Sequence, residues 1–392
     1  MTKSDDKRVP ALRFKGFTDE WEQRKLKNLV DFYSGLTYHP ENIREKGTFV
    51  IRSSNIKDGQ LVTGDNIFVA PEIVNSTYVK KDDIIVVVRN GSRKLIGKHT
   101  KLNFNLNNAV IGAFMTGIRS NNNNFINAIF DSDNFKREIH KNLGATINQI
   151  TTGELKRMNF YIPSLTSEQN YLGNLMKVLD KLITLQQRKL RQLKLLKNAL
   201  LKRMFTAKKS PTLRFRDFSK DWKLHKLQDI TDRLDNARVP VTASKRIAGS
   251  TPYYGANGIQ DYVKGYTHDG EFLLVAEDGA NNINDYPVIC AKGKIWVNNH
   301  AHVLQAKNKK IDILFLMYAL KFLNMKKYLV GGGRSKLNAE TMMKLALKLP
   351  ELDEEHNIGV LIKNMDVLIT QYKYRIQKIN KFKQFLLQNM FI

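Results

Sequence analysis

The chain has 392 residues with 42% hydrophobic side chains, which predicts two or three domains and excludes a wholly disordered chain. Its one cysteine, Cys290, excludes an internal disulfide or a cysteine-based zinc cluster, and no apolar run is long enough for a membrane span or placed as in a signal peptide. The formal net charge of +27 indicates an acidic partner, either nucleic acid or an anionic membrane surface. We therefore expect a cytoplasmic protein.

An opening segment occurs twice along the chain. Residues 10–21 read PALRFKGFTDEW and residues 211–222 read PTLRFRDFSKDW, an offset of 201. The identical pairs at this offset are Pro10 and Pro211, Leu12 and Leu213, Arg13 and Arg214, Phe14 and Phe215, Phe17 and Phe218, Trp21 and Trp222, Leu26 and Leu227, and Asp31 and Asp232. Chance does not produce such agreement, so the chain consists of two tandem copies of one unit.

Each opening segment is followed by a middle region that predicts mixed α/β structure with many short strands. The apolar runs 84–88 and 272–276 are typical of buried strands, and each leads into a turn that contains Asn-Gly or Asp-Gly. The segment 49–56 parallels the segment 252–259. The middle regions nevertheless differ far more between the copies than the segments that flank them.

Each copy ends in a stretch that predicts a long helix. Residues 168–205 match residues 354–391 at an offset of 186, and their apolar side chains recur mainly at spacings of three and four. A helix of this length would span roughly 57 Å. We expect the two apolar stripes to bury each other as an antiparallel coiled coil that serves as scaffold and binds partners. Its contact residues would be Leu175, Leu179, Leu182, Leu193, Leu361, Met365, Leu368 and Ile379.

The polar faces of these helices are strongly basic, and the sequence leaves their role open. They are either solvated or in contact with phosphate groups. A basic amphipathic helix can also lie on a membrane, but this reading is less favoured because each apolar stripe has a matching partner in the same chain.

No complete catalytic or metal-binding motif is found in the sequence. The stretch 91–99 resembles a P-loop, but its spacing is one residue too long and histidine replaces the hydroxyl that would bind magnesium. The Pro-Pro pair of an amino-methyltransferase motif is missing. His300 and His302 can share one face of a strand, yet they make at best half a metal site. We predict no catalytic residue and no bound metal.

Two diverged middle regions joined by shared helices suit a DNA site with two different halves. Proteins that read a site longer than one domain usually dimerise, and the half-site spacing follows from the geometry. A tandem duplication would place both reading surfaces in one chain, with the paired helices fixing their separation.

In this organisation the chain resembles the specificity subunits of type I restriction–modification enzymes. The resemblance rests on the repeated L-R-F-x-x-F-x-x-x-W segment, the N/D-G turns, and the I-P or L-P step into an E-x-x-x-x-G…D-x-x-I-T helix. Further matches are YYGANG at 253–258, the Gly-Ala pair at 279–280 and VNNHAHV at 297–303. The resemblance covers nearly the whole chain.

The resemblance implies an α+β fold with an internal pseudo-two-fold repeat. Target-recognition domain 1 would occupy residues 1–163, a central conserved helix 164–207, target-recognition domain 2 residues 208–350, and a C-terminal conserved helix 351–392. Two mixed α/β recognition domains would thus be joined by two long antiparallel helices.

The resemblance also implies a non-catalytic subunit that reads a bipartite DNA target, one domain per half-site. Its partners would be double-stranded DNA, two adenine methyltransferase subunits and the restriction subunits. No cofactor is expected in this chain, because S-adenosylmethionine, ATP and Mg would be bound by the partner subunits.

The polar loop residues are then the candidate DNA contacts, because Arg and Lys suit guanine and Asn and Gln suit adenine. In the first domain they are Arg52, Ser53, Asn55, Arg89, Asn90, Ser92, Arg93, Lys94 and Lys98. In the second domain they are Tyr253, Tyr254, Asn257, Asn298, Asn299, His300, His302, Arg334 and Lys336.

Three other functions remain open at this point. A stand-alone regulator with two DNA-reading heads would share the composition and the repeat, but it would bind its site tightly without a partner. A nuclease acting alone would need a metal–carboxylate cluster. A purely structural coiled-coil protein is disfavoured because most residues lie outside the predicted helices.

Overall fold

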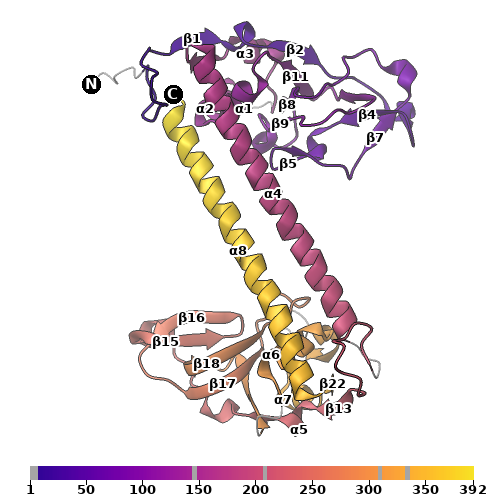
Figure 1. Cartoon of the computed structure of the whole chain (residues 1–392), viewed down its shortest axis with the longest axis vertical. Helices are drawn as coiled ribbons and strands as arrows, with labels where there is room; N and C mark the ends of the chain where they lie inside the picture. Colours follow the sequence, from indigo (N-terminus) through magenta and orange to yellow (C-terminus); the bar gives the residue numbers. More distant parts are fainter. Residues whose placement is uncertain (1–7, 144–147, 206–209, 308–310, 332–335) are drawn as a thin grey trace. The chain divides into compact units, whose positions relative to one another are not determined.

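The computed structural model describes residues 8–143, 148–205, 210–307, 311–331 and 336–392, and the chain divides into two compact units (Figure 1). Unit 1 consists of Met1–Gln187 and Tyr374–Ile392, and unit 2 consists of Arg188–Lys373. Both long helices therefore contribute residues to both units. The division expected from the sequence is different, with two recognition domains and two helices in chain order. The boundaries of those four segments stay a prediction.

The described residues of unit 1 form short strands arranged in two four-stranded sheets, with orders β2-β11-β8-β9 and β10-β4-β7-β3, and two small ladders, β1-β12 and β5-β6. The strands are β1 (Glu22–Lys25), β2 (Asp31–Ser34), β3 (Ile43–Arg44), β4 (Thr48–Ile51), β5 (Ile56–Lys57), β6 (Gln60–Leu61), β7 (Ile67–Val69), β8 (Ile84–Val87), β9 (His99–Lys101), β10 (Ala109–Ile111), β11 (Met115–Arg119) and β12 (Asn159–Ile162). The predicted run 84–88 forms β8, whose side chains are all buried.

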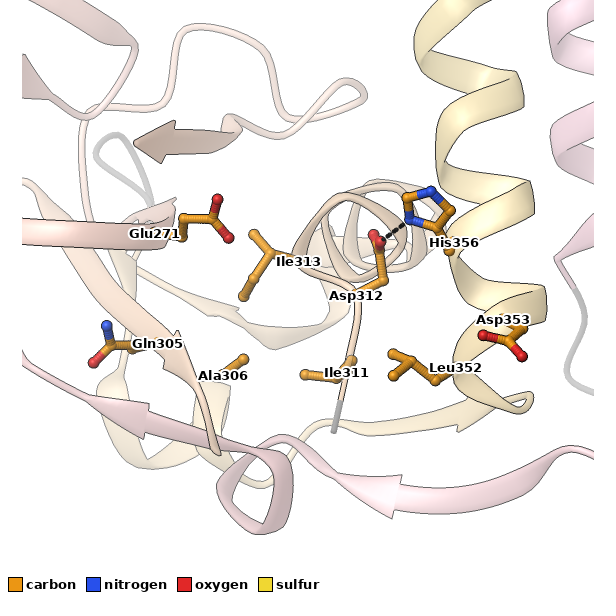
Figure 2. A pocket seen from close by; sticks show the side chains of 9 residues that line it. All are labelled: Glu271, Gln305, Ala306, Ile311, Asp312, Ile313, Leu352, Asp353 and His356. Carbon is orange, nitrogen blue, oxygen red and sulfur yellow. Dashed lines mark hydrogen bonds and ion pairs between the residues drawn. The ribbon is translucent and has the colours of Figure 1, made fainter. Parts of the chain in front are cut away.

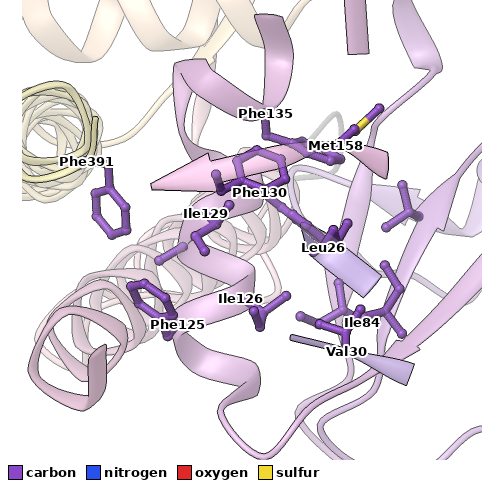
Figure 3. Close-up of a cluster of buried hydrophobic side chains, with 14 of the residues drawn as sticks. Leu26, Val30, Ile84, Phe125, Ile126, Ile129, Phe130, Phe135, Met158 and Phe391 are labelled. Carbon is purple, nitrogen blue, oxygen red and sulfur yellow. The ribbon is translucent and has the colours of Figure 1, made fainter. Parts of the chain in front are cut away.

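Three short helices cover part of unit 1, and each begins at a side chain that caps it. They are α1 (Asn123–Asp131), α2 (Asp133–Asn142) and α3 (Thr152–Arg157). Asn122, Ser132 and Thr151 accept the free backbone N–H groups of the first turns, which is why the helices start there. Figure 3 shows apolar side chains of α1 and α2 together with Leu26, Ile84 and Phe391 in one buried cluster.

Unit 2 contains one six-stranded sheet with the order β14-β19-β17-β18-β15-β16, and two small ladders, β13-β22 and β20-β21, among its described residues. The strands are β13 (Lys223–Lys226), β14 (Thr231–Arg233), β15 (Ala248–Gly255), β16 (Gly258–Val263), β17 (His268–Ala276), β18 (Val288–Val297), β19 (Ala301–Ala306), β20 (Leu329–Val330), β21 (Lys336–Leu337) and β22 (Ala346–Leu349). The short helices are α5 (Leu227–Ile230), α6 (Ile313–Phe322) and α7 (Ala339–Met343).

The strand registers show that the middle regions of the two units are built alike. In unit 1, Val87 lies opposite Met115 and Asp31 opposite Arg119. In unit 2, Ala276 lies opposite Ala301 and Asp232 opposite Gln305, so the order β2-β11-β8 returns as β14-β19-β17. The long β18 takes the places of both β9 and β10, because it pairs with β17 over residues 288–295 and with β15 at residues 296–297. This continuous strand joins into one sheet what unit 1 keeps as two.

The long helices α4 (Thr166–Met204) and α8 (Leu352–Met390) have 39 residues each and begin within two residues of the predicted positions. In unit 1, Lys383 contacts Asp180 (2.5 Å). In unit 2, Lys197 contacts Asp366 (2.5 Å). Both pairs are related by the offset of 186, and each joins an early position of one helix to a late position of the other. The predicted antiparallel pairing and the α+β class are confirmed.

Each opening segment is fastened to both helices within its unit. Arg13 forms a bidentate pair with the buried Glu168 of α4 (2.7 and 2.8 Å), and the Leu12 N–H donates to the Asn389 carbonyl of α8 (2.8 Å). In unit 2, the equivalent contacts are Arg214 with Glu354 and the Leu213 N–H with the Arg203 carbonyl. The repeated residues of the opening segments therefore make the same contacts with α4 and α8 in each unit.

The glycine early in α4 permits close approach to α1. A Cβ added at Gly173 would lie 2.6 Å from the backbone nitrogen of Phe125. Gly173→Ala should therefore destabilise unit 1 by about 1–3 kcal/mol, although alanine normally favours a helix. Urea unfolding of the chain measures this. Gly153→Ala in α3 is the control, since its Cβ would meet nothing closer than 3.7 Å. Equal effects of the two changes would contradict the expectation.

Candidate nucleic-acid interface

In unit 1, the predicted contact residues gather where β4 and β8 end. The Asn90 amide donates to the Ser53 hydroxyl (2.9 Å), and Lys98 Nζ lies 3.5 Å from the Ser53 carbonyl. The Asn148 amide donates to the Gly91 carbonyl (2.9 Å), which adds the segment before α3. We call residues 52–55, 89–94, 98, 112–114 and 148–149 the unit 1 loop cluster. The structure thus brings together residues that lie almost 100 positions apart.

The basic side chains of the unit 1 loop cluster differ in how firmly they are held. Arg52 donates to the backbone and the carboxylate of Asp65 (2.7 Å each), so part of its charge is already paired. Arg93 donates to the Leu143 carbonyl (3.2 Å) and remains exposed, as do Lys94 and Ser92. The guanidinium of Arg89 lies over the ring of Phe114, 5.0 Å from its centroid. These exposed cations are suited to meet phosphate or base oxygens.

Unit 2 builds a matching group of loops on the equivalent strands. The Asn257 amide donates to the Gly279 carbonyl, and its oxygen accepts the Asn281 N–H (2.9 Å each). His300 binds Asp278 through Nδ1 (2.5 Å), and Asn299 is exposed beside it. We call residues 255–258, 277–281, 298–302 and 336 the unit 2 loop cluster.

A network of charged side chains, with His302 buried among them, links the loops of the unit 2 loop cluster to Asp235 and Arg238. His302 Nδ1 contacts Asp235 (2.7 Å), while Arg238 and Lys336 both contact Glu277 (2.7 and 2.9 Å). Burial raises the pKa of Asp235 and of Glu277, but the hydrogen bonds and charges of His302, Arg238 and Lys336 outweigh burial and lower both pKa values. The two carboxylates therefore stay ionised and hold the basic side chains in place.

Five predicted contact residues are buried, which corrects their expected role. Their side chains lie inside the domains, where they cannot reach a base; they are Asn55, Tyr253, Tyr254, Asn298 and His302. Asn55 caps the turn after Arg52, and His302 belongs to the charge network. The phenol of Tyr253 binds both the N–H and the carbonyl of Val241 (3.0 and 3.2 Å). The short sequence motifs could not distinguish such anchors from contacts.

His300 and His302 also differ from the arrangement that a shared metal would need. They bind two different carboxylates, Asp278 and Asp235. Among the residues that the structure describes, no group of three His, Cys, Asp or Glu side chains is placed to hold a metal ion. Arg334 lies outside the described residues.

Sequence reasoning missed several residues in and beside the two loop clusters. The exposed Phe114 contacts Arg89, and the half-buried Asp278 contacts His300. The segment 239–250 runs along unit 2 with Lys245 and Ile247 exposed, and it is held by Tyr253 and by Arg246, whose guanidinium lies 4.1 Å from the Tyr253 ring centroid. The segments 112–115 (GAFM) and 298–301 (NNHA) share no identical residue, so no signal in the sequence indicated that Phe114 and His300 correspond.

The predicted scaffold residues of the helices fall into three groups. Leu179 and Met365 are buried, and Leu175, Leu193, Leu361 and Ile379 are half-buried. Leu182 and Leu368, which correspond to each other, are 38% and 42% exposed. Leu196 and Phe382 also correspond, and each is 52% exposed. Each unit therefore leaves apolar helix residues uncovered in the single chain.

A cavity of about 680 Å³ in unit 2 lies apart from the predicted contact residues. Figure 2 shows it between the start of α8 and the strands of the sheet, with His356 hydrogen-bonded to Asp312 (3.0 Å). None of the residues that line it belongs to the unit 2 loop cluster. Within the described ranges, no helix is both long enough and apolar enough to cross a membrane.

Comparison with known proteins identifies the family. The family model for the type I restriction modification DNA specificity domain matches residues 18–195 and again residues 219–381. A candidate type I restriction enzyme specificity subunit of Haemophilus influenzae is 41% identical over 151 residues, 38% of this chain and 38% of the relative. The specificity subunit of the EcoKI type I restriction enzyme of Escherichia coli is 26% identical over 160 residues, 38% of this chain and 34% of the relative. The matches thus span well under half the length of these curated relatives.

A solved structure shows the same fold over the full length. The crystal structure of the S subunit of a type I restriction–modification system from M. genitalium aligns with 98% of this chain and 99% of that chain, with a TM-score of 0.70 and 16% identity. Because the family model matches both copies and most of the chain, the chain belongs to the family of type I restriction–modification DNA specificity domains.

Proposed function

We propose that the chain is the DNA-specificity subunit of a type I restriction–modification complex and reads a bipartite target, one loop cluster per half-site. The observation that carries this proposal is that equivalent strands in the two units support equivalent polar loop clusters with different side chains. Two different half-sites require the same supporting strands in both units but different side chains on the loops that contact the bases. The net charge of +27 supplies the sequence-independent attraction to phosphate.

The chemistry of the complex would reside in partner subunits. The uncovered apolar residues Leu182, Leu196, Leu368 and Phe382 recur by the repeat, so they favour two copies of the same partner. We propose that these partners are two adenine methyltransferase subunits, joined by the restriction subunits, and that this chain itself is non-catalytic. S-adenosylmethionine, ATP and Mg would then be bound by the partners, and the complex would act in the cytoplasm, where the DNA lies.

Deleting the gene should abolish adenine methylation at one bipartite motif with a fixed spacer and leave all other motifs unchanged. Single-molecule sequencing of the host genome, before and after deletion and after restoring the gene, measures this. A genome in which no bipartite motif depends on the gene, although the partner subunits are expressed, would overturn the proposal. Tight binding of one sequence by the isolated chain would then favour the stand-alone regulator.

A further inference from the structure

Each loop cluster contains one pair of neighbouring side chains, and the two pairs occupy equivalent positions in the two units. In unit 1, the N–H groups of Val88 and Arg89 donate to the Phe114 carbonyl (3.0 and 3.2 Å). In unit 2, the Glu277 N–H donates to the His300 carbonyl (2.9 Å). With the registers of β8 on β11 and of β17 on β19, this makes Arg89 equivalent to Asp278, and Phe114 equivalent to His300.

A second set of contacts establishes the same equivalence independently. The Ile150 N–H donates to the Val88 carbonyl (2.8 Å), and the Leu337 N–H donates to the Glu277 carbonyl (2.7 Å). Isolated bridges join Arg89 to Gln149 and Asp278 to Lys336. The backbone therefore presents both pairs at the same place, directly after β8 in unit 1 and directly after β17 in unit 2.

The two pairs offer opposite hydrogen-bonding chemistry. In unit 1, the Arg89 guanidinium rests on the half-exposed Phe114 ring, and among the described residues it forms no ion pair. Stacking limits the rotamers of the guanidinium and leaves its planar set of N–H donors available to a ligand. A rigid fork of donors matches the O6 and N7 acceptors of guanine.

In unit 2, the same position carries a carboxylate and an imidazole. Nδ1 of His300 donates to Asp278 (2.5 Å), and the two side chains are 37% and 22% exposed. This hydrogen bond orients the imidazole against the Asp278 carboxylate, whose oxygens are hydrogen-bond acceptors. Acceptors at a reading position match the exocyclic amino group of adenine or cytosine, not the edge that Arg89 suits.

We propose that Arg89 with Phe114, and Asp278 with His300, are the corresponding base-reading pairs of the two half-sites: the first reads a guanine and the second an adenine or cytosine. This inference rests on the proposed function, because it concerns how the same loop clusters read DNA. It goes further by naming one position in each half-site, the polarity of its contact and the class of base.

Changing the unit 1 pair should alter one base position in one half-site only. Arg89→Lys keeps the charge but replaces the planar fork with a single ammonium group, so the preference for guanine at that position should fall from roughly ten- to a hundredfold to only about a few-fold. Methylation of genomic sites in cells with the cognate partner subunits gives the preference at every position of the motif. The exposed Lys46, on the turn before β4, provides the control Lys46→Gln, which should leave the motif unchanged.

Transplanting the unit 1 pair into unit 2 tests the reversal of polarity. Asp278→Arg with His300→Phe should change one position of the other half-site from adenine or cytosine to guanine. Because this double change also removes the hydrogen bond between the two loops, Asp278→Asn serves as the milder variant and should relax that same position.

The wild-type result separates the two proposals. Absence of any gene-dependent bipartite motif would overturn the proposed function. Two outcomes would overturn only the base-reading pairs. In the first, the wild-type motif is normal but has no guanine at the position that Arg89→Lys affects. In the second, Arg89→Lys lowers methylation equally at all sites. Equal loss would identify Arg89 as a phosphate contact.

Discussion

Glu354→Gln should lower the free energy of unfolding by about 3–5 kcal/mol, because it leaves Arg214 paired with a neutral group in a buried site. Glu354 is fully buried at the start of α8, and both of its oxygens accept hydrogen bonds from the guanidinium (2.7 Å each). These contacts raise the pKa of Arg214. The guanidinium also remains charged after its partner is lost, because arginine keeps its proton in proteins. Urea unfolding of the full chain at neutral pH measures the change.

The neighbouring Glu351 provides a matched control for this expectation. Glu351 pairs with Lys220 on the surface, where about half or more of both side chains is exposed. Glu351→Gln should therefore cost no more than about 1 kcal/mol. Replacing both members of the buried pair, as Arg214→Met with Glu354→Leu, should recover most of the loss, since no charge is then left without a partner. If Glu351→Gln and Glu354→Gln lowered the free energy of unfolding equally, the buried pair would stabilise the protein no more than the surface pair does.

Glu355→Gln, one residue further along α8, should have the opposite effect and stabilise the protein at neutral and alkaline pH. Burial, together with the nearby charge of Asp312, raises the pKa of Glu355 to about 8, although the Asp312 N–H donates to its carboxyl group (2.8 Å). Figure 2 shows Asp312 where α6 meets α8, hydrogen-bonded to His356. The folded chain must therefore keep a proton that the unfolded chain releases.

The sign of the pH dependence follows from this raised pKa. The contribution of Glu355 to stability is complete below its ordinary pKa of 4.5 and is lost as the pH rises toward about 8. At pH 7 the glutamine variant, which needs no proton, should gain about 2–4 kcal/mol over the wild type. At pH 4 the two should be equally stable.

Unit 1 already carries the substitution at the equivalent position. Gln169 corresponds to Glu355 by the offset of 186, and its amide donates to the Pro163 carbonyl (2.9 Å). Thermal unfolding of the wild type and of Glu355→Gln between pH 4 and pH 8 measures the effect. Asp353→Asn, an exposed change on the same turn, is the control. A gain that does not grow with pH would contradict the assignment of a raised pKa to Glu355.

Much of the architecture could be predicted because it is encoded locally and repeated. The apolar spacing in 168–205 and 354–391 predicted α4 and α8, since a helix buries residues three and four apart on one side. Pro163 and Pro350, the prolines of the I-P and L-P steps, lie just before these helices, between them and the strands β12 and β22. The repeated opening segments predicted two copies of one unit. The structure gives the reason for the repeat, because Arg13 pairs with Glu168 and Arg214 pairs with Glu354 in the same way.

The candidate contact residues were only partly predictable, because exposure is not a property of a short motif. Tyr253 and His302 stand in polar, motif-like stretches, yet both are buried by segments distant in the chain, such as residues near Val241 and Asp235. Conversely, the exposed Phe114 carried no signal of its own. Its importance arises from Arg89, 25 positions earlier, which the pairing of β8 with β11 brings over its ring.

The sequence by itself determined the duplication, the two long helices, the α+β class and the family, because identities at a fixed offset and apolar periodicity survive without any knowledge of contacts. Only the tertiary structure decided which loops meet, which polar side chains are anchors, and that Arg89 and Asp278 occupy equivalent positions of opposite polarity. The physical reason is that burial and pairing depend on contacts between segments far apart in the sequence, such as Arg13 and Glu168, which are 155 positions apart.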